Sequence, residues 1–185
     1  MLVFGYGSLL NRATLPPGAR LEEATITGWV RQWRNRCATA TGPVCGLTLA
    51  PRARSVVEGA VMHFAPEHHN ALMAREADYA QMSECEAQLA AGESVIVTVF
   101  SSRPELNDWA CDALPICLSY VDVVLQGFLQ VYGAAGVEHV LDTTEGWHLP
   151  LINDRSLPRY PRPVALAPLE LDLIDESLRV RRLID

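Results

Sequence analysis

The sequence predicts an α+β protein built around a largely antiparallel or mixed β-sheet. Several β-type segments follow one another in the N-terminal half, and helical periodicity appears between and after them. The 185 residues, of which 49% are hydrophobic and 20% charged, suffice for a buried core. A single domain over residues 1–185 is therefore expected.

The expected strands are apolar or β-branched runs bounded by turn-forming residues. Gly5 ends the first, and "SVIVTVF" is the clearest of them. They are predicted over residues 1–4, 25–38, 44–49, 56–64 and 94–100, with a polar turn at 51–55.

The expected helices follow from periodicity and from their end signals. One begins with a Pro and an acidic residue in its first turn, and a second is apolar and stops at Gly133. They are predicted over residues 66–82, 114–133 and 136–142, with one helical turn at 11–15. The Pro-rich residues 149–165 are expected to lie extended on the surface.

Charge and hydropathy exclude several classes of partner. The net charge is -7, and all 15 basic residues are arginines, without a basic cluster. Nucleic acid and anionic membranes are poor partners for such a chain. No apolar run approaches the roughly 20 residues of a membrane span, and no basic segment precedes an apolar one as in a signal peptide. A small-molecule or protein partner and a cytoplasmic location are expected.

Cysteine and histidine spacings do not indicate a metal site. The five cysteines form no CxxC pair, and the five histidines form no HExxH motif. Reduced cysteines that serve mainly in packing are expected, with no metal and no cofactor.

The first strand runs directly into a glycine-containing loop, "GYGSL". Glycines on both sides of Tyr6 would let successive N–H groups turn the same way and form an anion-binding concavity, to which Ser8 adds a hydroxyl. Dinucleotide binding is excluded because the third glycine of GxGxxG is replaced by Leu10. The GxSxG nucleophile elbow is absent too. The loop is thus either a plain turn or a ligand-binding backbone, and Ser8 is a hydrogen-bonding residue in preference to a nucleophile.

Glu76 occupies an unusual position in "NALMAREADYAQM", residues 70–82. On a helix it falls within an apolar arc of roughly 120°, between Leu72 and Ala80, whereas Arg75 and Asp78 project outward. A carboxylate that faces the core needs a partner or a cavity, and partial burial would raise its pKa toward neutrality. Two interpretations stay open: a proton-transferring group, or a structural salt bridge to Arg34 or Arg36.

Together these motifs resemble the γ-glutamylcyclotransferase superfamily, and most closely its ChaC-like, glutathione-acting branch. The resemblance rests on Tyr6-Gly7-Ser8-Leu9, on "RExxY" at residues 75–79, and on "GWVRQW" and "VEGAVMHF" between them. It implies a small mixed β-barrel with helices packed around it. It also implies that the loop and the helical glutamate face one cavity.

Carried over residue by residue, the resemblance makes Glu76 the catalytic residue. Tyr6, Gly7, Ser8 and Leu9 would bind the γ-glutamyl group through backbone amides and the Ser8 hydroxyl. The substrate's own α-amine would attack its γ-carbonyl and release 5-oxoproline, with Glu76 as general acid and base. Such a reaction needs no cofactor and no metal.

Three functions stay open on the sequence. The first is a cyclotransferase acting on glutathione or another γ-glutamyl compound, and the second is a γ-glutamylamine cyclotransferase. The third is a non-catalytic module that binds γ-glutamyl metabolites.

Further candidates for the cavity are side chains for which core packing or local ion pairs are also good explanations: Tyr120, Tyr132, Tyr160, Asp154, Arg155 and Arg159. The sequence does not predict the oligomeric state.

Overall fold

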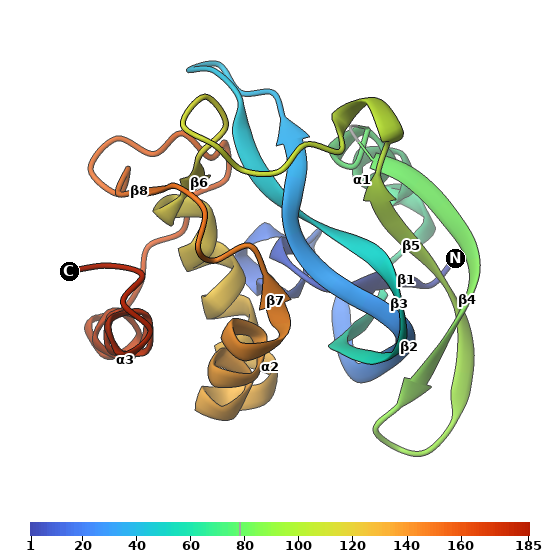
Figure 1. Ribbon diagram of the computed structural model, residues 1–185. Coiled ribbons are helices and arrows are strands. Elements are labelled where there is room, and N and C mark those ends of the chain that lie inside the picture. The colour runs from blue at the N-terminus through green and yellow to red at the C-terminus, as the bar shows by residue number, and fades with distance from the viewer. Residues whose placement is uncertain (78) are drawn as a thin grey trace.

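The computed structural model describes residues 1–77 and 79–185, and residues 81–84 by their backbone alone. Its centre is a closed five-stranded barrel with helices packed outside it (Figure 1). The barrel strands are β1 (Val3–Gly5), β2 (Arg20–Cys37), β3 (Val44–His63), β4 (Tyr79–Leu89) and β5 (Ser94–Ser102). The expected α+β class with a small mixed barrel is confirmed.

The barrel closes because β2 pairs with two different neighbours. β2 and β3 form a long antiparallel hairpin, while Ala24 and Thr25 of β2 also pair with the end of β4. β4 and β5 are antiparallel, and β1 fills the remaining gap, antiparallel to β3 and parallel to β5. This one parallel contact makes the barrel mixed. It places the end of β1, and the glycine-containing loop after it, at the rim.

The predicted turn at residues 51–55 is wrong, because β3 continues through it. Pro51 pairs with Trp29 and Val56 with Thr27, so residues 52–55 bulge opposite the single residue Gly28. Positive φ angles at Gly28 (+91°) and Arg54 (+67°) accommodate the bulge. Polar residues that read as a break between two strands therefore form a bend within one.

The predicted helix at residues 66–82 is much shorter in the structure. A 3-10 turn, Pro66–His68, leads into α1 (His69–Arg75), and β4 starts at Tyr79. Pairing of Tyr79 with Ser102 of β5 holds this segment as a strand, and such non-local pairing outweighs local helical periodicity. Glu76 consequently caps the helix instead of lying within it; Asp78, expected to point outward, lies outside the described residues.

The predicted apolar helix is confirmed with a later start. Ile116 and Cys117 form strand β6, which pairs in parallel with β3 and β8 (Leu151–Ile152), so α2 begins at Leu118. α2 runs over Leu118–Thr143, with a break at Gly133, where φ is +67°. The break separates the two helices expected on either side of it. After α2, β7 (Thr144–Glu145) pairs with β2.

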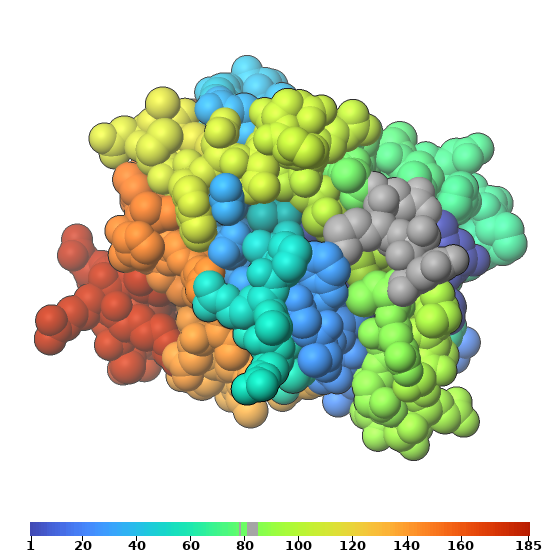
Figure 2. Space-filling view, turned by 45° about the vertical axis from the view of Figure 1, so that its right-hand side comes forward, coloured from blue at the N-terminus to red at the C-terminus, as the bar shows by residue number. Residues whose placement is uncertain are grey.

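The C-terminal helix α3 (Pro168–Val180) was not anticipated, although its sequence carries the usual start signals. Pro168 occupies the first turn, and the Glu170 carboxylate accepts a hydrogen bond from the Ala167 N–H. Ile174 and Leu178 are buried in the main core. α3 and the β4–β5 hairpin lie at opposite sides of the molecule (Figures 1 and 2).

Within the described part of the chain, no helix combines the length and the apolar character needed to cross a membrane.

Candidate active site

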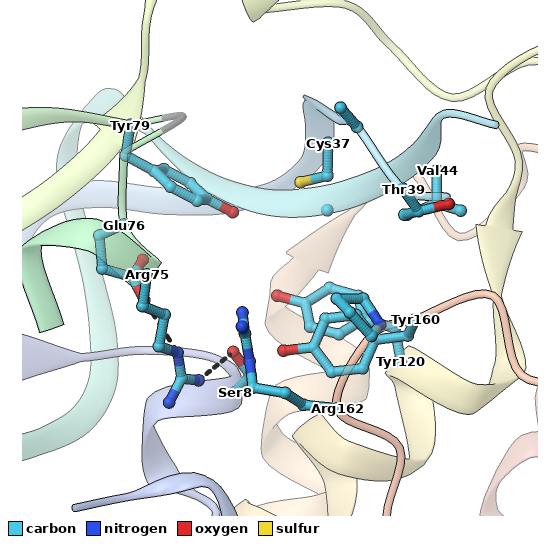
Figure 3. Close-up of a pocket in the computed structure, with 13 residues that line it drawn as sticks. Ser8, Cys37, Thr39, Val44, Arg75, Glu76, Tyr79, Tyr120, Tyr160 and Arg162 are labelled. Carbon is cyan, nitrogen blue, oxygen red and sulfur yellow. Dashed lines mark hydrogen bonds and ion pairs between the residues drawn. The ribbon is translucent and has the colours of Figure 1, made fainter. Parts of the chain in front are cut away.

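Five segments meet around one pocket at the rim of the barrel (Figure 3). They are the loop after β1, the connection between β2 and β3 with its flanking strand ends, the end of α1 with the start of β4, the first turn of α2, and the Pro-rich segment before α3. The pocket encloses about 540 Å³ of empty space, its open mouth included. Its polar lining includes Ser8, Arg75, Glu76, Tyr79, Tyr120 and Tyr160.

The loop after β1 turns through a 3-10 helix, Ser8–Leu10. Gly5 allows this tight turn, because a Cβ there would lie 2.9 Å from Leu9 Cβ. Gly7 passes close to Tyr120, whose hydroxyl oxygen would lie 3.6 Å from an added Cβ. Neither glycine has a positive φ. Gly5 is required because the close packing of Leu9 leaves no room for a side chain at that position.

The predicted loop residues present different groups to the site. Ser8 lines the main pocket, and all of Tyr6 to Leu9 line a smaller one that shares Ser8 and Glu76 with it. The Tyr6 hydroxyl donates to the carbonyl oxygen of Phe100 at 2.6 Å, and burial together with the nearby Glu76 carboxylate raises the pKa of Tyr6 far above its usual value. The Leu9 side chain packs in a small apolar cluster. Ser8 is thus the loop residue whose polar side chain faces the main pocket.

Glu76 is 9% exposed, which confirms its predicted inward orientation. Its partner is the preceding residue: Arg75 Nε lies 3.1 Å from Glu76 Oε1, and each side chain is 10% exposed. Arg75 also donates to Ser8 Oγ at 3.1 Å and to the carbonyl oxygen of Thr14 at 2.6 Å. The outward orientation expected for Arg75 is wrong, because the helix ends there and its side chain turns back toward the loop.

Arg75 therefore links the two halves of the site. One guanidinium contacts both the carboxylate at the end of α1 and the hydroxyl of the loop after β1 (Figure 3). A planar guanidinium with five N–H donors suits such a double role.

Three tyrosines line the pocket: Tyr79 lies beside Glu76, and Tyr120 and Tyr160 lie on the opposite side (Figure 3). The Tyr79 hydroxyl donates to the carbonyl oxygen of Leu47 at 3.0 Å, while the rings of Tyr120 and Tyr160 pack together with centroids 4.6 Å apart. Burial raises the pKa of Tyr79 and of Tyr120 well above 10, so both stay neutral at physiological pH. Tyr120 belongs to the pocket as well as to the core; Tyr132 instead donates to backbone carbonyls of β2 and β3.

The other charged candidates have structural partners. Arg36 pairs with Asp108, and the Arg34 guanidinium lies over the Trp109 ring. The salt bridge that was considered from Glu76 to Arg34 or Arg36 is therefore wrong in its partner, because Glu76 pairs with Arg75.

Asp154 and its two neighbouring arginines organise the Pro-rich segment. The Asp154 carboxylate accepts from Ser119 and from the Arg159 N–H, and Arg155 pairs with Asp122 and Asp175. Their contacts favour local ion pairing over a role in the pocket.

None of the five cysteines forms a disulfide. Among the side chains that the structure describes, those of residues 1–77, 79–80 and 85–185, no cluster of three or more histidine, cysteine or acidic groups has the arrangement of a metal site.

Comparison with known proteins places the fold. No protein-family model matches the sequence, and no curated protein matches it. Among solved structures, a γ-glutamyl cyclotransferase superposes with a TM-score of 0.65 over 95% of this chain and 98% of its own, at 15% identity. The chain has the γ-glutamyl cyclotransferase fold.

Two further solved structures share this cyclotransferase fold. An uncharacterized protein from Homo sapiens gives a TM-score of 0.64 at 14% identity, covering 94% of this chain and 97% of its own. YkqA from Bacillus subtilis gives 0.55 at 12% identity, covering 79% of this chain and 56% of its own.

Proposed function

We propose that the protein is a γ-glutamyl cyclotransferase that releases 5-oxoproline from glutathione or another γ-glutamyl compound. The observation that carries the proposal is the pocket shared by Glu76 and Ser8, whose side chains are joined through Arg75. The cyclotransferase fold supports the same conclusion.

In the proposed reaction the substrate supplies its own nucleophile. Glu76 removes a proton from the α-ammonium group, and the freed amine attacks the γ-carbonyl carbon to close a five-membered ring. The protonated Glu76 then gives that proton to the departing amine as the original amide bond breaks. The ring nitrogen loses its second proton to the released amine, which leaves as an ammonium group. One carboxylate thus acts first as base and then as acid.

The loop and Arg75 prepare the site for this chemistry. Ser8 Oγ accepts a hydrogen bond from Arg75, so the Ser8 hydroxyl hydrogen is left for the γ-glutamyl group. Donors from Tyr6 to Leu9 would hold the substrate in its ring-closing conformation and stabilise the developing oxyanion, an effect of about 3 kcal/mol for each well-placed donor. Arg75 orients the Glu76 carboxylate between turnovers.

Two alternatives use the same pocket. A γ-glutamylamine cyclotransferase would share the mechanism and differ only in the leaving group. A non-catalytic module would bind γ-glutamyl metabolites without converting them. Glu76 favours catalysis, since burial of a carboxylate is costly and a pure binding pocket has no need of one beside the loop.

The test is to incubate the protein with glutathione, γ-Glu-Ala and a γ-glutamylamine and to measure 5-oxoproline. Glu76→Gln should lower turnover at least about 100-fold, the usual loss when a general acid–base group is removed, with an unchanged circular dichroism spectrum. Glu67→Gln, an exposed change just before α1, is the matched control and should retain full activity. Full 5-oxoproline release by Glu76→Gln would refute the mechanism, and no release from any substrate by the wild type would favour the binding module.

A further inference from the structure

The mouth of the pocket is formed by a segment with a fixed path. Residues 158–163 contain three prolines, which restrict the backbone, and the Arg159 N–H donates to Asp154 at 2.8 Å. The Arg159 side chain donates to the carbonyl oxygen of Pro43 at 2.9 Å, and Tyr160 is buried against Tyr120. The next polar residue, Arg162, is therefore held at the edge of the pocket.

Arg162 extends over the Tyr160 ring and into the pocket opening (Figure 3). Its guanidinium carbon lies 5.6 Å from the ring centroid, within range of a cation–π contact. Arg162 is exposed, and among the described residues no carboxylate lies within ion-pair distance of it. Arg75, in contrast, is already paired with Glu76.

The charges of the pocket lining do not cancel. Arg75 and Glu76 neutralise each other, and Tyr79 and Tyr120 are neutral, which leaves the charge of Arg162. A pocket with one surplus positive charge, in a chain of net charge -7, is suited to a ligand with one net negative charge.

We propose that Arg162 binds a carboxylate on the leaving group, so that the substrates are γ-glutamyl amino acids or peptides and not γ-glutamylamines. This inference rests on the proposed function. The γ-glutamyl half carries one ammonium and one carboxylate and is neutral overall, and its amine and γ-carbonyl must lie beside Glu76 and the loop. The leaving group then points to the mouth, where its carboxylate supplies the negative charge that matches Arg162. A guanidinium held over an aromatic ring suits a planar carboxylate.

The test compares γ-Glu-Ala with γ-Glu-alaninamide, which differs in lacking the terminal charge. The wild type should show a kcat/KM about tenfold higher for the acid, the usual scale for a charged hydrogen bond at a partly exposed site. Arg162→Gln should remove this preference by lowering kcat/KM for the acid alone. Arg20→Gln, an exposed change on β2 outside the pocket lining, is the control and should keep the preference.

Each other outcome overturns the inference in a recognisable way. Equal wild-type rates for acid and amide would refute it while leaving the cyclotransferase proposal intact. An equal loss for both substrates in Arg162→Gln would assign Arg162 to the γ-glutamyl half instead. If no substrate released 5-oxoproline, the proposed function would fail, and the same pair measured as dissociation constants would still decide whether Arg162 selects the carboxylate.

Discussion

Replacing Arg75 by methionine tests the link between the two halves of the site. The change keeps a long side chain but removes the ion pair with Glu76 and the hydrogen bonds to Ser8 and Thr14. Both charges are 10% exposed, so little water is available to replace the guanidinium. Removing one member of a buried pair typically costs 3–5 kcal/mol, and the remaining exposure puts the expected loss in the free energy of unfolding at about 3 kcal/mol.

The assay is urea unfolding of Arg75→Met, Glu76→Gln and the double variant. Because the single change leaves a buried carboxylate without a partner, the double variant should be more stable than Arg75→Met alone, by about 1–2 kcal/mol. Arg12→Met, an exposed change in the neighbouring 3-10 turn, should alter stability by less than about 0.5 kcal/mol. A loss below about 1 kcal/mol in Arg75→Met, with no recovery in the double variant, would refute a buried coupled pair.

Two further predictions concern the barrel and its pH dependence. In Gly59→Ala the new Cβ would lie 2.5 Å from Phe4 Cζ and against the Gly5 carbonyl oxygen, so β1 must shift. The free energy of unfolding should fall by about 3 kcal/mol. An unchanged midpoint of urea denaturation would contradict this. Burial raises the pKa of Tyr79 and of Tyr120 well above 10, so above pH 10 the unfolded chain releases protons that the folded chain retains. The contribution of these two tyrosines to stability is complete below pH 10 and falls by about 1.4 kcal/mol per tyrosine and pH unit above it. Above pH 10, tyrosinate absorbance should rise with unfolding. Replacement of either tyrosine by phenylalanine should reduce the slope of the unfolding free energy against pH. Ionisation of both near pH 10 in the folded protein would contradict this.

The parts of the fold set by local pattern were predictable. The strand at residues 94–100 and the helix break at Gly133 follow from β-branched composition and from glycine, and both are present. The inward direction of Glu76 is also present, although the helix from which it was predicted ends at Arg75. Such features depend on residues a few positions apart.

The parts that the sequence did not predict depend on distant contacts. The helix from Pro66 ends at Arg75 because the following residues pair with β5, and nothing in their own periodicity signals that pairing. Arg75 turns inward to reach Ser8, 67 positions earlier in the chain. Arg162 lines the pocket because the Pro-rich segment crosses its mouth. Only α3 carried a local signal that could have been used, in Pro168 and Glu170.

In the proposed reaction the substrate's own amine is the nucleophile in the pocket of Glu76. Turnover of a γ-glutamyl amino acid labelled with ¹⁵N at its α-amine, in water enriched in ¹⁸O, tests it most directly by mass spectrometry. The wild type should form 5-oxoproline with ¹⁵N in its ring and no ¹⁸O, and Glu76→Gln should lose this product. Glutamate carrying ¹⁸O as the product would mean that water attacks the γ-carbonyl, and would rule out attack by the substrate amine.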